Sequence, residues 1–165
     1  MRLRRRTLAV LVAGVSLLAL AGCQKPVPEV GIVSGGTYLT QPASTYCFTL
    51  GPAPKCRTGH EAPREVHVRE GAAIGVSVPR DVADSPWYLE LSLPGQPATA
   101  QRSPIQEVGT TYLSLTPRFA TAPRLQAEVV SGRFDGRQLL EAGRWRFLLV
   151  REARPAAPAG EPSGS

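Results

Sequence analysis

The chain has 165 residues and a formal net charge of +6, and its residues are 42% apolar, 19% charged and 6% aromatic. The length fits one domain, and 16 Gly with 16 Pro interrupt the sequence too often for a helical bundle. With two His and one Met, neither a histidine-built catalytic or metal centre nor a Met-rich copper site is expected. We expect no cofactor.

Residues 1–22 form a predicted export signal. Four Arg within residues 1–6 precede an apolar run over 8–20, which is too short to span a bilayer as a stable helix. The run ends in Leu-Ala-Gly-Cys at 20–23, which resembles the bacterial lipobox. We therefore expect cleavage before Cys23 and acylation of its sulfur, with chains such as palmitate. The alternatives are a secretory leader before an ordinary cysteine, or an uncleaved anchor. Residues 5–8 also resemble a weak twin-arginine signal.

The predicted lipid anchor determines the expected location. Two acyl chains give stable membrane attachment, so the domain is expected on the extracytoplasmic side of the cell membrane. The leader holds four of the 19 basic residues, and the chain from Cys23 onward therefore has 15 basic against 13 acidic side chains. This near balance gives no electrostatic reason to expect nucleic acid. The expected partners are the membrane itself and an envelope protein or an anionic wall polymer.

Two cysteines remain after Cys23. Cys47 and Cys56 are an even pair in an oxidising compartment, separated by a segment with one Gly and two Pro. We predict a structural disulfide between them, because a turn-rich spacer of this length can bring two Cα atoms into range. Zinc ligation by the pair with His60 is the alternative, but it lacks a fourth strong ligand.

The rest of the chain divides into three parts. Residues 23–29 form a Pro-rich tether, residues 30–152 a β-domain, and residues 153–165 an Ala/Pro/Gly/Ser-rich tail that we predict to be disordered. Within the domain, apolar residues alternate with polar ones at the period of a β-strand. The predicted strands cover 30–33, 45–50, 65–69, 74–78, 87–93, 111–115, 125–129 and 144–150. A single helical turn is predicted over 81–84.

Seven or eight short strands, each with one apolar face, predict an all-β fold. We expect an antiparallel, immunoglobulin-like β-sandwich, because one sheet could not cover its own apolar face. The predicted core contains nine inward-facing residues, namely Val76, Val78, Trp87, Leu89, Leu91, Leu113, Val129, Trp145 and Phe147.

The sequence offers no catalytic motif. There is no Gly-x-Ser-x-Gly, no phosphate loop and no His-Glu-x-x-His, so no catalytic and no metal-binding residue is assigned. His67 is expected to be a solvated histidine on the polar face of a strand. Asp81 and Asp84 could pair for acid–base chemistry, although capping of the helical turn is the favoured interpretation.

Basic and aromatic side chains offer two weaker signals. Arg144 and Arg146 share the outward face of the last predicted strand, with Arg133, Arg137, Arg151 and Arg154 near in sequence. This ladder suits anionic headgroups or wall polymer, and the alternative is an edge strand protected by charge. The second is aromatic, since four tyrosines could line a binding face, namely Tyr38, Tyr46, Tyr88 and Tyr112. Four tyrosines are, however, ordinary in a sheet protein.

Several of these segments also carry a family resemblance. They are Tyr46-Cys47, Cys56, Val66 and Val68, Gly71, the stretch 75–79 (Gly-Val-Ser-Val-Pro) and the stretch 82–87 (Val-Ala-Asp-Ser-Pro-Trp). Together with the lipobox and the late strand around Trp145 and Phe147, they resemble small actinobacterial lipoproteins grouped as a domain of unknown function. The resemblance is closest over residues 45–90. It implies a membrane-tethered domain and transfers no catalytic residue.

The sequence therefore predicts a lipid-anchored, non-catalytic envelope module that binds a protein, a polymer or a small ligand. The alternatives are an envelope hydrolase or transferase, which needs an activated Ser, Thr or Asp, and an accessory subunit of a membrane transporter or synthase.

Overall fold

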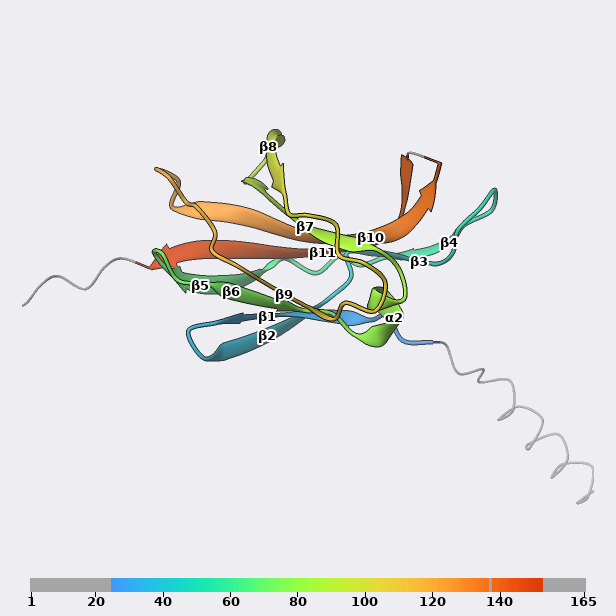
Figure 1. Ribbon diagram of the computed structural model, residues 1–165, viewed down its shortest axis with the longest axis horizontal. Helices are drawn as coiled ribbons and strands as arrows, with labels where there is room; N and C mark the ends of the chain where they lie inside the picture. Colours follow the sequence, from blue (N-terminus) through green and yellow to red (C-terminus); the bar gives the residue numbers. More distant parts are fainter. Residues whose placement is uncertain (1–24, 137, 153–165) are drawn as a thin grey trace, which may run out of the picture.

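The computed structural model describes residues 25–136 and 138–152, which form eleven β-strands and one short helix (Figure 1). The predicted signal peptide, the candidate lipid site Cys23, Arg137, Arg154 and the predicted tail lie outside these residues. The described part is an all-β sandwich of two sheets, as the alternating pattern predicted.

The smaller sheet has four strands, all antiparallel. They are β1 (Glu29–Ser34), β2 (Thr37–Pro42), β6 (Ile74–Ser77) and β9 (Tyr112–Leu115), in the order β2-β1-β6-β9. The two central strands β1 and β6 are the most apolar, and Val30, Ile32, Ile74 and Val76 point from them into the sandwich with at most 1% exposure.

The larger sheet has seven strands. They are β3 (Thr45–Thr49), β4 (Lys55–Thr58), β5 (Arg64–Arg69), β7 (Trp87–Leu93), β8 (Gln96–Arg102), β10 (Arg124–Asp135) and β11 (Gln138–Glu152). The order is β4-β3-β11-β10-β7-β8, and β5 also pairs with β11. The β5–β11 pair is parallel, which differs from the fully antiparallel arrangement expected. This parallel pairing is possible because β5 and β11 come from distant parts of the chain, so no hairpin has to join them.

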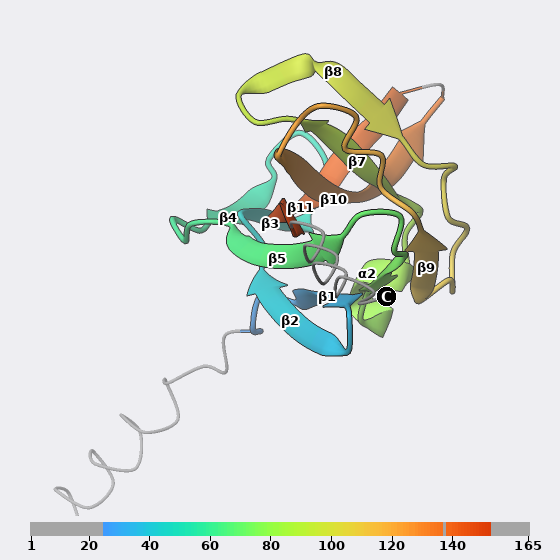
Figure 2. The same ribbon diagram turned by 90° about the vertical axis from the view of Figure 1, so that its left-hand side faces the viewer.

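The core lies between the two sheets, which Figure 2 shows as two stacked layers. Trp87, Trp145 and Phe147 are fully buried and fill its centre. Of the nine predicted core residues, seven are buried. The other two, Leu91 and Leu113, are partly buried and pack against the core.

Three strands were missed by the sequence analysis, namely β2, β4 and β8. All three lie at sheet edges. β4 is exposed along its whole length, and β8 has only one residue that is even half-buried. An edge strand of this kind has no buried face, so the apolar alternation that reveals a strand is weak or absent. The prediction of seven or eight strands was therefore too low.

The outer face of the larger sheet is covered by its own side chains, although alternation predicts a solvated face. Tyr88, Glu128 and Val130 are buried there, with 8%, 6% and 1% exposure. The guanidinium of Arg102 lies 5.3 Å from the centre of the Tyr88 ring. Long arginine stems shield apolar surface in this way while the charge stays at the surface.

The helix α2 (Arg80–Ala83) occupies the predicted helical turn. Pro79 precedes it without a side-chain cap, and Asp84 ends it through its backbone N–H, so neither aspartate caps the turn with its carboxylate as expected. Asp81 instead pairs with Lys25 at 2.8 Å. No helix in the described part of the chain is both long and apolar enough to cross a membrane.

Candidate functional site

A hollow lies at one side of the sandwich, between the edge strands β8 and β9. It has a volume of about 380 Å³ and is lined by β7, β8, the end of β9 and the segment that follows β9. Figure 2 shows that β8 and β9 belong to different layers and are linked by the chain on this side. Among the described residues, no strand closes the gap between the two sheet edges here, and Leu91 and Leu93 on the inner face of β7 remain partly exposed. We call this hollow the edge pocket.

The floor of the edge pocket is apolar. It consists of core-facing side chains, namely Leu89, Leu91, Leu93, Leu115, Phe119 and Leu125. Leu91 and Leu93 of β7 and Leu115 of β9 remain only partly buried. An apolar hollow of this size with a few polar groups around it is the usual form of a small-ligand site.

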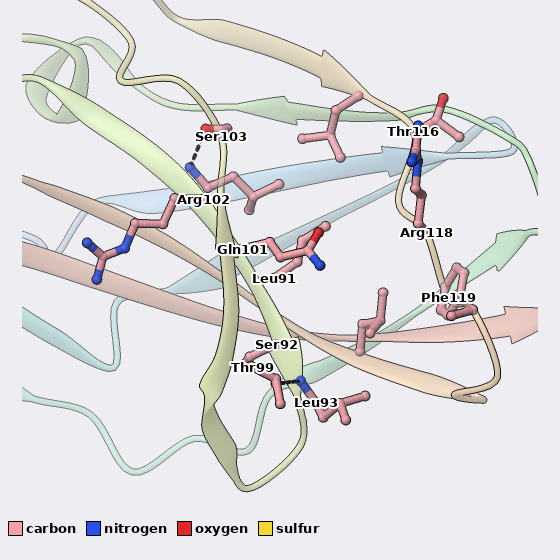
Figure 3. A pocket seen from close by; sticks show the side chains of 14 residues that line it. Leu91, Ser92, Leu93, Thr99, Gln101, Arg102, Ser103, Thr116, Arg118 and Phe119 are labelled. Atoms are coloured by element: carbon pink, nitrogen blue, oxygen red, sulfur yellow. Dashed lines mark hydrogen bonds between the residues drawn. The ribbon is translucent and has the colours of Figure 1, made fainter.

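The rim of the edge pocket is polar and mostly uncharged. Ser103 Oγ accepts a hydrogen bond of 3.0 Å from the Leu89 N–H, and Thr99 Oγ1 accepts one of 2.9 Å from the Leu93 N–H. Both bonds hold β8 against β7 (Figure 3). Figure 3 also shows Gln101 extending its amide into the space between this hairpin and Phe119.

Two arginines line the edge pocket and differ in their partners. Arg102 points away from the hollow (Figure 3), where its Nε lies 2.7 Å from the Glu90 carboxylate. Arg118 lies in the segment that follows β9 and is exposed. It makes no ion pair with any residue that the structure describes. Arg118 is therefore a cation available to a ligand at the mouth of this pocket.

The backbone beside Arg118 is unusual. Ala120 has a φ of 45°, which makes it the one non-glycine residue with positive φ in the described ranges. Its carbonyl oxygen accepts a hydrogen bond of 3.1 Å from Arg151 Nη1 of β11. Backbone in this region is costly for a residue with a Cβ and persists where surrounding contacts hold it, often beside a ligand site.

The arginine ladder predicted on the last strand is neutralised in the structure. Glu128 of β10 is buried between Arg144 and Arg146 of β11 and pairs with both, at 2.9 Å for Arg146 Nε. Arg144 also pairs with Glu141 at 2.7 Å, and these two carboxylates, Glu141 first, raise the pKa of Arg144 despite its partial burial. The alternative of a charge-protected edge strand is wrong, because β11 lies inside its sheet between β3 and β10.

The predicted disulfide is present. Cys47 of β3 and Cys56 of β4 face each other as a cross-strand pair and are bonded. Both sulfurs are occupied, so neither serves as a thiolate for zinc with His60. His60 and His67 are both exposed, the first in the loop after β4 and the second on β5. No group of three or more potential metal ligands forms among the described residues.

The four tyrosines do not form one face. Tyr46 packs edge-on against Phe48 and near Trp145, and Tyr88 lies beneath Arg102 on the larger sheet. Tyr38 and Tyr112 lie on the outer face of the smaller sheet and are more than half exposed. The edge pocket was not predicted from the sequence. Of its leucines, Leu89 and Leu91 were predicted in the core, and its rim comes from a loop and from β8, a strand that was not predicted.

The fold and the site define a two-sheet β-sandwich with an apolar pocket at its open edge. A protein-family model matches residues 23–135, and its family is described as a protein of unknown function, DUF2771. The chain belongs to this family, in agreement with the domain of unknown function that its motifs resembled. No curated protein matches the chain.

Proposed function

We propose that this protein is a lipid-anchored binding module on the extracytoplasmic side of the cell membrane, and that its edge pocket takes the apolar part of an anionic amphiphile. The observation that carries the proposal is the edge pocket itself, with leucines on its floor and the available cation of Arg118 at its mouth. Burial of an alkyl chain contributes about 0.8 kcal/mol per CH₂. Arg118 then attracts the anionic head, which remains in water.

The leader supports the lipid anchor, and the contacts of residues 25–28 indicate which end of the domain such an anchor would hold. Lys25 pairs with Asp81 of α2, Val27 packs against the core, and the Pro28 carbonyl accepts a hydrogen bond from Trp145. Two residues of extended chain reach at most about 7 Å. Acylation of Cys23 would therefore hold the α2 end of the domain close to the lipid headgroups.

The edge pocket would then be accessible from the envelope. In Figure 1, the loop between β9 and β10, which carries Arg118, lies at the end of the molecule away from α2. With α2 at the membrane, this loop projects from the surface. This orientation suits a module that receives its ligand from outside the bilayer to which it is tethered.

The anchor is tested by replacing Cys23. Cells that express the native chain or Cys23→Ser are fed a clickable fatty acid, and the protein is followed in membrane and released fractions. We expect label and membrane association for the native chain and neither for the variant. If Cys23→Ser keeps both the label and its membrane association, the anchor proposal is refuted, and the proposal for the edge pocket is unaffected.

The pocket is tested with laurate as the probe and the full chain in detergent-free nanodiscs. Leu91→Trp fills the hollow, and Arg118→Glu reverses the charge at its mouth; we expect each to weaken laurate binding at least about tenfold. Arg133→Glu, which reverses an exposed arginine on β10, is the matched charge control and should bind as the native chain does. Equal binding by all four proteins, or none by the native chain, would contradict the proposal.

A further inference from the structure

Two uncharged rows of rings, hydroxyls and glycines cross the outer face of the smaller sheet. The exposed Glu29 of β1 lies beside them on the same face, two residues before Gly31. Strand pairing places eight residues in two rows across the four strands β2, β1, β6 and β9. The first row is Tyr38, Val33, Gly75 and Ser114, and the second is Thr40, Gly31, Ser77 and Tyr112. Their neighbours along β1 and β6, such as Ile32 and Val76, point into the core, so these eight face outward. We call these eight residues the tyrosine platform.

Each tyrosine of the platform lies across a glycine of the neighbouring central strand. A Cβ added to Gly31 would lie 2.3 Å from the Tyr38 hydroxyl oxygen, and one added to Gly75 would lie 2.2 Å from that of Tyr112. Both rings therefore lean inward from the edge strands β2 and β9 and lie down on the sheet. Gly31 and Gly75 are diagonal neighbours on β1 and β6, so both ring tips lie over the two central strands of the platform.

Covering a strand glycine with a ring compensates for the missing side chain and is a known stabilising device in sheets. It does not account for the exposure that remains, since Tyr38 and Tyr112 are still 56% and 55% exposed. Two rings held flat by the sheet below them lose little conformational freedom when a ligand arrives. This is why tyrosine is favoured on recognition surfaces.

We propose that the tyrosine platform binds a neutral glycan. A sugar ring presents C–H groups on its faces and hydroxyls around its edge. The C–H groups stack on the electron-rich faces of Tyr38 and Tyr112. The hydroxyls pair with the tyrosine hydroxyls and with Thr40, Ser77 and Ser114, which provide both donors and acceptors.

The charges and dimensions of the platform favour this ligand class over others. None of the eight residues is charged, so an anionic polymer gains nothing there. Four strands about 4.8 Å apart give a platform roughly 14 Å across, long enough for more than one sugar ring. The platform lies outside the sandwich and shares no residue with the edge pocket, so this proposal does not depend on the proposed amphiphile or on the anchor.

The glycines allow a test that moves the rings without removing them. In Gly31→Ala and Gly75→Ala, the new Cβ displaces the end of a flexible tyrosine side chain, and neither glycine has a positive φ that would strain an alanine. The double variant should therefore fold with close to native stability, because alanine removes the entropic cost of glycine and this gain offsets the lost ring cover. Its rings can no longer lie flat on the sheet.

The experiment measures binding of the full chain to dextran, mannan and arabinan by affinity electrophoresis, in a detergent without a sugar headgroup. We expect the native chain to bind at least one, with an affinity that is unchanged from about 0.1 M to 1 M NaCl. Tyr38→Ala, Tyr112→Ala and the double glycine variant should each bind about tenfold more weakly. Phe134→Ala, which removes an exposed aromatic elsewhere, is the matched control and should bind as the native chain does.

Three outcomes would overturn the proposal. The first is that the native chain binds none of the three glycans. The second is that polygalacturonate, an anionic counterpart, binds equally well and in a salt-dependent way. The third is that sedimentation velocity shows a dimer that the platform substitutions dissociate, because the platform would then be an interface between two copies of this chain.

Discussion

The indole Nε1 of Trp145 donates a hydrogen bond of 2.8 Å to the carbonyl oxygen of Pro28, across 117 residues of sequence. Trp145 is fully buried at the centre of the core. The segment that follows Cys23 is thereby fixed to the middle of β11. The other tryptophan behaves similarly, since Trp87 Nε1 donates to the Thr110 carbonyl at 2.6 Å and fixes the loop between β8 and β9.

Trp145→Phe should loosen the N-terminal segment specifically. The ring packing is largely kept, but the bond to Pro28 is lost, which we expect to lower the free energy of unfolding by about 1–3 kcal/mol. Hydrogen exchange at Val27 and Glu29 should accelerate. Trp87→Phe is the matched control. It should lower the free energy of unfolding by a similar amount but accelerate hydrogen exchange near Thr110 instead. Identical exchange patterns in the two variants would contradict the assignment of each segment to its own tryptophan.

Removal of the disulfide should destabilise the domain without abolishing its fold. The bridge joins two paired strands at a sequence separation of 9, and loop entropy gives it roughly 2–3 kcal/mol. We expect the Cys47→Ala/Cys56→Ala double variant to show this loss in denaturant melts. Non-reducing peptide mapping of the native protein should recover the linked pair, and recovery of two alkylated free thiols would contradict the bond.

Glu128→Gln should destabilise more than Glu90→Gln. Glu128 is 6% exposed and neutralises both Arg144 and Arg146, so its loss leaves a partly buried guanidinium with Glu141 as its remaining carboxylate. We expect Glu128→Gln to lower the free energy of unfolding by about 2–4 kcal/mol, between the values for breaking a surface ion pair and a buried one. Glu90 pairs with the largely exposed Arg102, and its loss should cost under about 1 kcal/mol. Chemical denaturation of both variants measures their free energies of unfolding, and equal losses of stability would contradict the prediction.

Tyr88→Phe should reduce the loss of stability at alkaline pH. Burial raises the pKa of Tyr88, and the nearby Arg102 opposes the shift only in part. A folded pKa above the unfolded value of about 10 means that the neutral phenol stabilises the fold below that pH. This contribution is lost as the pH rises through the folded pKa.

The measurement is the free energy of unfolding between about pH 9 and pH 12. Tyr88→Phe should flatten its decline, since phenylalanine has no proton to lose. Tyr46→Phe should act in the same direction, because burial also raises the pKa of Tyr46. An unchanged alkaline slope in the double variant would show that neither phenol is shielded from water.

Sequence alone determined the fold class, most of the core and the cysteine pairing. Alternation at Trp87 and Leu89, or at Trp145 and Phe147, is a local signal, because each residue points the same way whichever strand it pairs with. The Cys47–Cys56 pair is also local, since a short spacer keeps the two cysteines near each other. These features needed no knowledge of which strands are neighbours.

The tertiary structure alone decided the strand order and both candidate sites. The edge strands β2, β4 and β8 bury too few side chains to show a pattern, and the parallel β5–β11 pair joins distant segments. Arg144 and Arg146 are neutralised by a glutamate on another strand, which sequence spacing does not show. The edge pocket is lined by residues of β7, β8, β9 and β10, and only the fold brings these strands together around it. The tyrosine platform exists because pairing sets Tyr112 opposite Ser77 and brings its ring over Gly75, 37 residues away. Such features depend on register between strands, and register follows from how the whole core packs.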